Sequence, residues 1–277
     1  MKIIRNVTEM SRYHLECSGP LGLVPTMGSL HMGHISLINQ GAADNNSLVV
    51  SIFVNPTQFG PSEDLENYPR GIEADLALLE DLQVNVAFLP TNEDIYPTAF
   101  DTWVRVGNIT NVLEGKSRPD HFVGVATVVT KLFNIVKPDR VYFGQKDAQQ
   151  VLVVKRLIED LNLGIDLVTM PTVREPDGLA MSSRNTYLNP FDRDAANILF
   201  KAISLAREQY SNGQRDANDM RQSMRNLISS EPRASIDYIS ISDEQSLEEL
   251  DKIGNTALLS LAVYIGQTRL IDNCILG

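Results

Sequence analysis

Residues 25–34 read Pro-Thr-Met-Gly-Ser-Leu-His-Met-Gly-His and decide how the chain is interpreted. The apolar run Leu21 to Val24 before them predicts a short strand, and Ile35 to Ala42 after them predicts a helix. The amide N–H groups at a helix N-terminus attract anions. Two imidazoles three residues apart, at His31 and His34, would share one helix face. The stretch therefore predicts a strand-to-helix turn that holds phosphate.

Short apolar runs alternate with helical patterns through about residue 170. Strands are predicted at 48–54, 84–89, 140–143 and 165–170. Helices are predicted where apolar residues recur at helical spacing, at 72–82 and 151–161. This alternation is typical of an α/β fold with a parallel sheet, in which ligands bind beyond the carboxyl ends of the strands.

The pattern changes after residue 174. Asn189-Pro190 predicts the start of a helix with apolar residues from Ala195 to Ala206, and a more polar helix is expected at 216–229. Strands are predicted at 236–241, 257–265 and 269–275. We therefore expect a parallel-sheet domain at 1–174 and a smaller α+β domain with a short antiparallel sheet at 175–277.

Composition narrows the classes of protein. A net charge of −11 argues against nucleic-acid binding, which depends on neutralising phosphates. No apolar run approaches membrane-spanning length, and the N-terminus does not resemble a signal peptide. Cys17 and Cys274 are expected to be free thiols. We expect a cytoplasmic protein without a metal site of its own.

Two further segments follow predicted strands. Residues 55–60 (Asn-Pro-Thr-Gln-Phe-Gly) suit a plain turn, or a site in which the Gln58 amide holds a small polar substrate. Residues 144–147 (Gly-Gln-Lys-Asp) suit phosphate and ribose binding, although a surface loop with a Lys-Asp salt bridge is the commoner case. Gln149 and Gln150 follow, and either side chain could turn back toward the site.

Residues 177–185 and 115–122 are ambiguous in the same way. The first segment contains Ser182, Ser183 and Arg184, which suit a triphosphate clamp or a run of capping serines. The second is basic and reads as an exposed turn, or as a loop that brings Arg118 and His121 over the site.

Residues 25–34 resemble the HIGH motif of the nucleotidyl-transferring α/β superfamily. Together with the other segments they resemble the pantoate–β-alanine ligase family almost end to end. The matching segments are 25–28, 31–34, 51–59, 68–70, 118–122, 143–147 and 177–185. Each is a weak signal alone, but their order and spacing are specific.

The resemblance implies a Rossmann-like fold and ATP-dependent condensation of pantoate with β-alanine through pantoyl adenylate, which releases AMP and pyrophosphate. It also implies that 1–174 is the ATP- and pantoate-binding domain and that 175–277 is a lid-like domain. It also implies Mg²⁺ accompanying ATP, and a homodimer. It implies His34, His31, Lys146 and Arg184 as catalytic residues. The ATP-binding set would be Met27, Gly28, Ser29, Leu30, His31, Met32, Gly33, His34, Gly144, Gln145, Lys146, Asp147, Val173, Met181, Ser182, Ser183 and Arg184. Gln58 and Gln150 would bind pantoate. Gln58, with Asn55, Tyr68 and Arg118, would bind β-alanine.

Three rivals remain at this point. Another nucleotidyltransferase of the same fold would not need residues 55–59 and 143–147 in this form. A tRNA-charging enzyme would carry lysines at the position of residues 180–184, which contain none. A nucleotide sensor would bind ATP without turnover.

Overall fold

A computed structural model describes residues 1–60 and 63–277. Residue contacts divide the chain into two units. The first comprises residues 1–110, 114–144 and 149–171, and the second comprises 111–113, 145–148 and 172–277. Residues 145–148 therefore group with the C-terminal part of the chain, although they directly follow a strand of the first unit. The predicted roles of domains 1–174 and 175–277 stay predictions.

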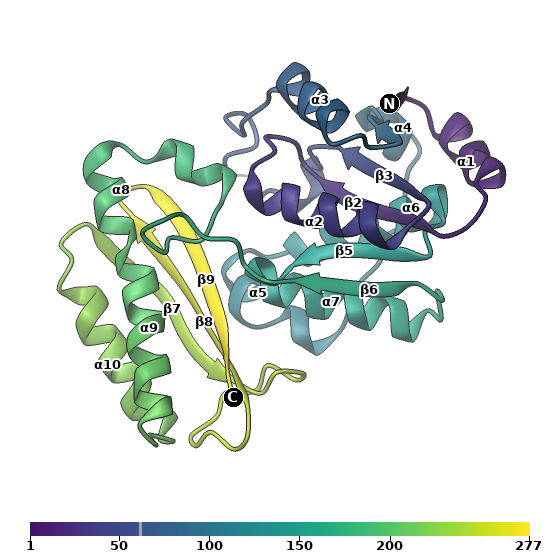
Figure 1. The fold of residues 1–277 in the computed structure, drawn as a ribbon. Coiled ribbons are helices and arrows are strands. Elements are labelled where there is room, and N and C mark those ends of the chain that lie inside the picture. The colour runs from purple at the N-terminus through teal and green to yellow at the C-terminus, as the bar shows by residue number, and fades with distance from the viewer. Residues whose placement is uncertain (61–62) are drawn as a thin grey trace. The chain divides into compact units, whose positions relative to one another are not determined.

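The first unit is built on a six-stranded sheet in the order β1-β4-β3-β2-β5-β6, and every neighbouring pair is parallel (Figure 1). This confirms the predicted α/β class. The strands are β1 (Lys2–Ile4), β2 (Leu21–Thr26), β3 (Ser47–Ile52), β4 (Val86–Phe88), β5 (Arg140–Gly144) and β6 (Asp166–Met170).

Several helices connect these strands, and some were not predicted. The described elements are α1 (Val7–Glu16), α2 (Met32–Asp44), η1 (Pro56–Gln58), α3 (Ile72–Asp81), α4 (Asn92–Ile95), η2 (Asn108–Thr110), α5 (Leu113–Ser117), α6 (His121–Val136) and α7 (Ala148–Asp160). The sequence reading missed β1, α1 and α6. Most of helix α6 is buried, and only a narrow stripe of Thr130, Lys131 and Asn134 forms its polar side.

Strand order brings the segments that follow β2 and β3, residues 25–34 and 55–60, to one edge of the sheet. Strands β3 and β4 lie on one side of β2 in the sheet, and β5 and β6 lie on the other side. The topological switch point is therefore between β2 and β5. Right-handed crossovers put α2 and α7 on opposite faces, because the two connections run in opposite directions. Pairing of β2 with β5 is confined to Gly22 with Arg140 and Leu23 with Val141, short of both carboxyl ends.

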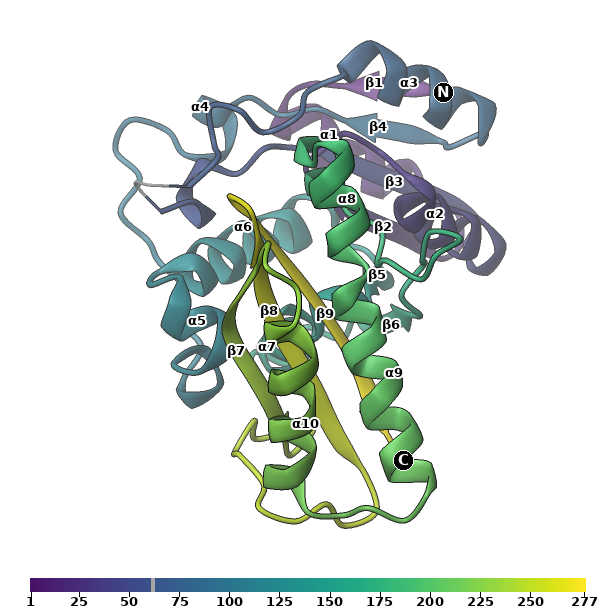
Figure 2. The same cartoon turned by 90° about the vertical axis from the view of Figure 1, so that its left-hand side faces the viewer.

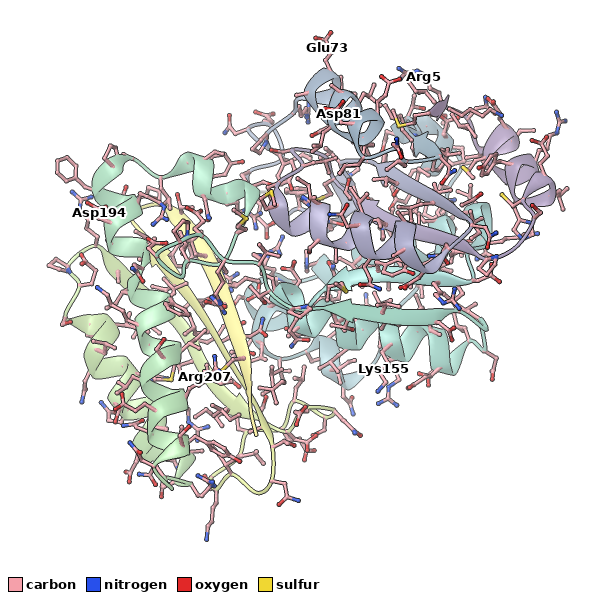
Figure 3. The ribbon with its side chains drawn as sticks, viewed as in Figure 1. Arg5, Glu73, Asp81, Lys155, Asp194 and Arg207 are labelled. Carbon is pink, nitrogen blue, oxygen red and sulfur yellow. The ribbon has the colours of Figure 1, made fainter. Side chains whose placement is uncertain are left out.

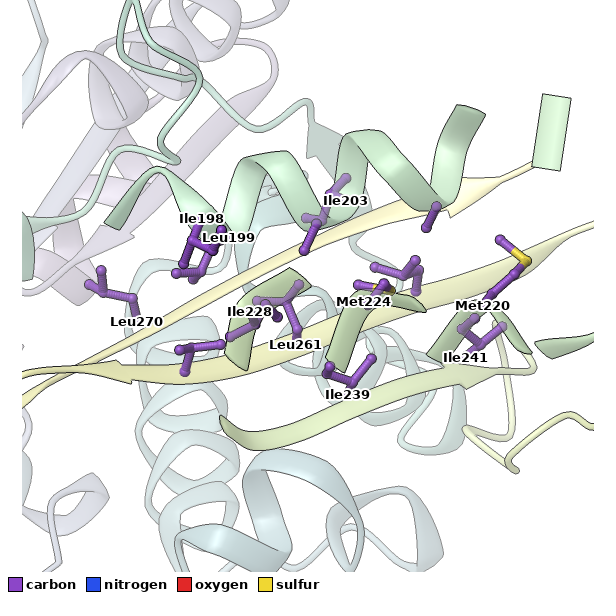
Figure 4. Packing of buried hydrophobic residues seen from close by; sticks show 14 of the residues in the cluster. Ile198, Leu199, Ile203, Met220, Met224, Ile228, Ile239, Ile241, Leu261 and Leu270 are labelled. Atoms are coloured by element: carbon purple, nitrogen blue, oxygen red, sulfur yellow. The ribbon is translucent and has the colours of Figure 1, made fainter. Parts of the chain in front are cut away.

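The second unit contains an antiparallel sheet of β7 (Ala234–Ser242), β8 (Ala257–Ile265) and β9 (Thr268–Leu276). Its helical elements are η3 (Gln145–Asp147), η4 (Ser183–Tyr187), α8 (Pro190–Ala196), α9 (Ile198–Ser211) and α10 (Ala217–Ser229). Helices α9 and α10 lie along the sheet (Figure 2). Their apolar faces form a core with β8, in which Leu199, Met224 and Leu261 are fully buried (Figure 4).

Most predicted elements of this unit are confirmed within one or two residues. Asn189 caps α8 by accepting a hydrogen bond from the Asp192 amide, and Pro190 is the first helical residue. The predicted helix through residues 195–206 is two helices, because α8 ends at Ala196 and α9 begins at Ile198.

Truncating a buried side chain in the hydrophobic core of the second unit should lower the free energy of unfolding. We expect Leu261→Ala to lower the free energy of unfolding by about 2–5 kcal/mol, because it leaves a cavity under α9 and α10. Urea unfolding measures this. Ile275→Ala on β9 is the control, because Ile275 is 42% exposed and should lose far less. Equal losses would contradict this account of the core.

Candidate active site

The strand-to-helix turn after β2 is closed by its two histidines. His31 is the N-cap of α2, and its Nδ1 accepts the Gly33 amide at 3.1 Å. His34 Nδ1 accepts the His31 amide at 3.2 Å. The arrangement is a capping box in which imidazoles replace the usual hydroxyl and carboxylate. The rings are adjacent, with centroids 4.1 Å apart, although His31 lies just outside the helix and not on its face.

This cap fixes the chemistry that each ring presents. A ring nitrogen that accepts a hydrogen bond carries no proton, so the neutral imidazole has its proton on Nε2. Each histidine therefore directs an N–H donor away from the helix backbone. Gly33 is required here, because a Cβ at this position would lie 2.8 Å from Cε1 of His31.

The turn before the cap is held by Asp75 of α3. Its Oδ2 accepts the Ser29 amide at 2.9 Å and its Oδ1 accepts the Leu30 amide at 2.8 Å. Asp75 is only 5% exposed, whereas Glu73 on the same helix projects outward (Figure 3). The left-handed φ values of Gly28 (81°) and Ser29 (52°) allow the turn that presents these amides.

Gln58 is the meeting point of the segments predicted to bind pantoate and β-alanine. Its side-chain oxygen accepts from Asn55 Nδ2 at 3.1 Å, and its Nε2 donates to Met27 Sδ at 3.0 Å. Its backbone oxygen accepts from Arg118 Nη2 at 3.3 Å and from His121 Nδ1 at 2.8 Å. Met27, Asn55, Gln58 and Arg118 were predicted separately, and the structure brings them together.

Asn55 confirms the turn interpretation, because it caps η1 and its side-chain oxygen accepts the Thr57 amide. It is also 1% exposed, and its amide group donates to the Gly124 carbonyl as well as to Gln58. Tyr96, which the sequence reading did not single out, donates its hydroxyl to Asn55 Oδ1 at 2.8 Å. Tyr68 is buried edge-on against the ring of Phe59.

Arg118 and His121 are not on an exposed turn. Arg118 makes a two-pronged ion pair with Glu63, with contacts of 2.8 and 2.6 Å, and donates Nη1 to His121 Nε2. Because arginine can only donate, His121 is neutral, with its proton on Nδ1 directed at Gln58. Burial, followed by the charge of Arg118, lowers the pKa of His121 to about 4.

The 145–147 segment forms η3, and Lys146 Nζ lies 3.2 Å from Asp147 Oδ1, so the predicted local salt bridge is confirmed. Gln149 and Gln150 differ. Gln149 is buried, accepts the Glu114 amide and donates to the Ile109 carbonyl, so it ties down residues 109–114. Gln150 is half-buried in the first turn of α7.

The last predicted segment lies in the second unit. The carbonyl of Val173 accepts the Met181 amide at 3.0 Å. Ser182 caps η4 by accepting the Arg184 amide, which confirms the capping interpretation for that serine, and Ser183 is buried. Thus Val173 and residues 181–184 form one hydrogen-bonded turn.

Other chemistries find little support in the described part of the chain. Burial raises the pKa of Cys274 to about 12, so this thiol is a poor nucleophile. Both cysteines are free, as predicted. Over residues 1–60 and 63–277, no group of three His, Cys, Asp or Glu side chains is placed to hold a metal. None of the helices described is long and apolar enough to cross a membrane.

A parallel α/β sheet with paired imidazoles at the turn beyond a switch-point strand defines an α/β nucleotide-binding enzyme class. The sequence model described as pantoate-beta-alanine ligase matches residues 2–275. The chain is 54% identical to the pantothenate synthetase of Roseiflexus castenholzii, over 100% of this chain and 99% of the relative. It therefore belongs to the pantoate–β-alanine ligase family, as the motifs predicted.

Solved structures agree. The pantothenate synthetase of Thermus thermophilus matches with a TM-score of 0.95 and 41% identity, covering 99% of both chains. The Francisella tularensis pantoate-beta-alanine ligase, complexed with beta-gamma ATP and beta-alanine, matches with a TM-score of 0.82 and 37% identity, over 99% of this chain and 97% of that one. The family's reaction is the ATP-dependent condensation of pantoate with β-alanine.

The buried His121 should make stability depend on pH. Its ordinary pKa is near 6.5, so between about pH 6.5 and 4 the unfolded chain binds a proton that the folded chain does not. Wild type should therefore lose roughly 2–3 kcal/mol relative to His121→Gln as the pH falls from about 7 to about 4.5. Urea unfolding of both proteins at the two pH values measures this. A constant difference would contradict the assignment.

Proposed function

We propose that the chain makes pantothenate in two steps through pantoyl adenylate. The observation that supports this most is the imidazole cap at the start of α2, which directs two Nε2–H donors from one helix N-terminus. Such a group suits a triphosphate, because both the donors and the helix dipole favour negative charge.

In the first step a carboxylate oxygen of pantoate attacks the α-phosphorus of ATP. The bond from that phosphorus to the β-phosphate oxygen breaks, and pyrophosphate leaves with the electron pair. His31 and His34 would donate to the phosphate oxygens, and Lys146 and Arg184 would add positive charge. The remaining ATP contacts are proposed from residues 27–30, 32–33, 144–145, 147, 173 and 181–183. Phosphoryl transfer needs positioning and charge stabilisation above all.

In the second step the amine of β-alanine attacks the acyl carbon of pantoyl adenylate. The bond to the AMP oxygen breaks, giving AMP and the amide, and the amine loses a proton. Gln58 and Gln150 would bind pantoate, and Gln58, Tyr68 and Arg118 would lie where β-alanine binds. Because its side chain already holds Gln58, Asn55 would act mainly by orienting that amide. No enzyme nucleophile is needed.

The remaining proposals concern context. Mg²⁺ would arrive with ATP, held by phosphate oxygens and water, and would neutralise phosphate charge. A homodimer and a cytoplasmic location are proposed from the family resemblance and composition.

The adenylate route has a direct test. With ATP and pantoate but without β-alanine, the enzyme should exchange labelled pyrophosphate into ATP, because the first step is reversible. Without pantoate the exchange should vanish. A folded sample that forms pantothenate but shows no exchange would exclude a free adenylate.

Lys146 should matter for rate and not for folding. Removing one charged donor to the transition state costs on the order of 10²–10³ in rate. We expect Lys146→Ala to slow pyrophosphate exchange by about that factor with little change in Tm. Lys155→Ala, at an exposed lysine of α7 (Figure 3), should exchange at the wild-type rate. A wild-type rate in Lys146→Ala would remove Lys146 from the mechanism.

A further inference from the structure

We propose that Asp272 and Asn273, two consecutive residues of β9, are positioning residues that anchor both ATP-binding segments of the second unit. Asn273 would hold residues 145–147, and Asp272 would hold the turn that carries Val173 and residues 181–184. The inference rests on the proposed ATP contacts of these segments, and neither β9 residue belongs to any motif of the sequence reading.

The side chain of Asn273 forms its hydrogen bonds with η3. Its Nδ2 donates to the carbonyls of Gln145 and Lys146, both at 2.8 Å. Its Oδ1 accepts from Gln145 Nε2 at 3.2 Å. Asn273 is only 4% exposed. Two backbone carbonyls and one side chain are thus fixed by a single rigid amide, which determines where the backbone under Lys146 lies.

Asp272 holds the other segment through Arg174. Its carboxylate accepts from Arg174 Nη1 at 2.6 Å and from Nη2 at 2.9 Å, and it is almost completely buried. Arg174 also donates Nη1 to the Gly178 carbonyl, and its guanidinium lies over the ring of Phe200. The arginine directly follows Val173, and its bridge to Ala180 leads into residues 181–184.

Strand geometry explains why adjacent residues serve different segments. Successive side chains point to opposite faces of a sheet. Asp272 shares its face with Leu270, Cys274 and Leu276, which pack in the core beneath α9 and α10. Asn273 points to the other face, where η3 lies. One strand therefore sets the positions of both segments at once.

A general structural role is the alternative. A polar pair buried only for stability would change Tm when altered, but would not act selectively on ATP. A positioning role predicts weaker ATP binding together with local loosening of the anchored segment, while pantoate binding by the first unit stays constant.

Hydrogen exchange and calorimetric ATP titration distinguish the positioning role from the general structural role. We expect Asn273→Ala to raise amide exchange in the peptide covering residues 144–150, and Asp272→Asn to raise it in residues 172–185. Each variant should weaken ATP binding about 10- to 100-fold, the scale of losing one hydrogen bond to a charged group. Asn226→Ala, an exposed asparagine of α10, is the matched control and should change neither. If Asn273→Ala fails to fold, Asn273→Leu keeps the volume and removes the same donors.

Wild-type ATP affinity in a folded Asn273 variant would overturn the proposal, as would loosening that spreads evenly over the chain. The double variant Lys146→Ala/Asn273→Ala should bind ATP about as weakly as whichever single variant binds it less tightly. Both changes should affect the same contact, that between Lys146 and ATP. Full additivity would overturn the coupling to Lys146. Because affinity is measured without turnover, failure of the adenylate route would appear only in pyrophosphate exchange and leaves this test intact.

Discussion

The reciprocal hydrogen bonding of His31 and His34 is the constraint on which the proposed phosphate site depends. Each Nδ1 satisfies a backbone amide at the start of α2, so the helix N-terminus and the ring tautomers are fixed together. Protonating either Nδ1 would break a cap bond, which favours neutral donors over an imidazolium acid. The Asp75 carboxylate fixes the preceding turn in the same way, by accepting two amides. In the proposed mechanism the histidines would thus stabilise departing charge without being the source of a proton.

In the first unit, the residue proposed to bind substrate, Gln58, is positioned by other residues that surround it. Its backbone carbonyl is fixed by Arg118 and His121, and its side chain is oriented by Asn55. Helix α6 can approach this closely because Gly124 has no Cβ, which would lie 2.4 Å from the Thr57 carbonyl oxygen. A neutral His121 suits this place, because an imidazolium beside the Arg118 guanidinium would be repelled in a buried setting.

The sequence predicted the elements whose patterns are local. Most strands were predicted from apolar runs, α10 as a more polar helix, and the start of α8 from the cap Asn189-Pro190. Helix α6 was missed because most of its residues are apolar and buried, and its polar side is only a narrow stripe of Thr130, Lys131 and Asn134. His-x-x-His has the spacing of a capping box, so the cap was readable in principle. Asp75 and Asn273 could not be found, because the partners that explain them lie 45 or more and about 128 residues away.

The residues that the sequence did not predict share one physical property, which explains why they were missed. Asp75 and Asn273 are buried polar side chains that bond to segments predicted to contact ligand. A buried polar group without a partner is costly, so each must be matched by a specific backbone or side-chain group. Because of that requirement, these side chains hold their partner segments rigidly. Hydrophobic periodicity does not predict them, because it assigns polar residues to the surface. Family motifs mark the residues proposed to touch substrate, whereas the supports that set their geometry emerge only from the fold.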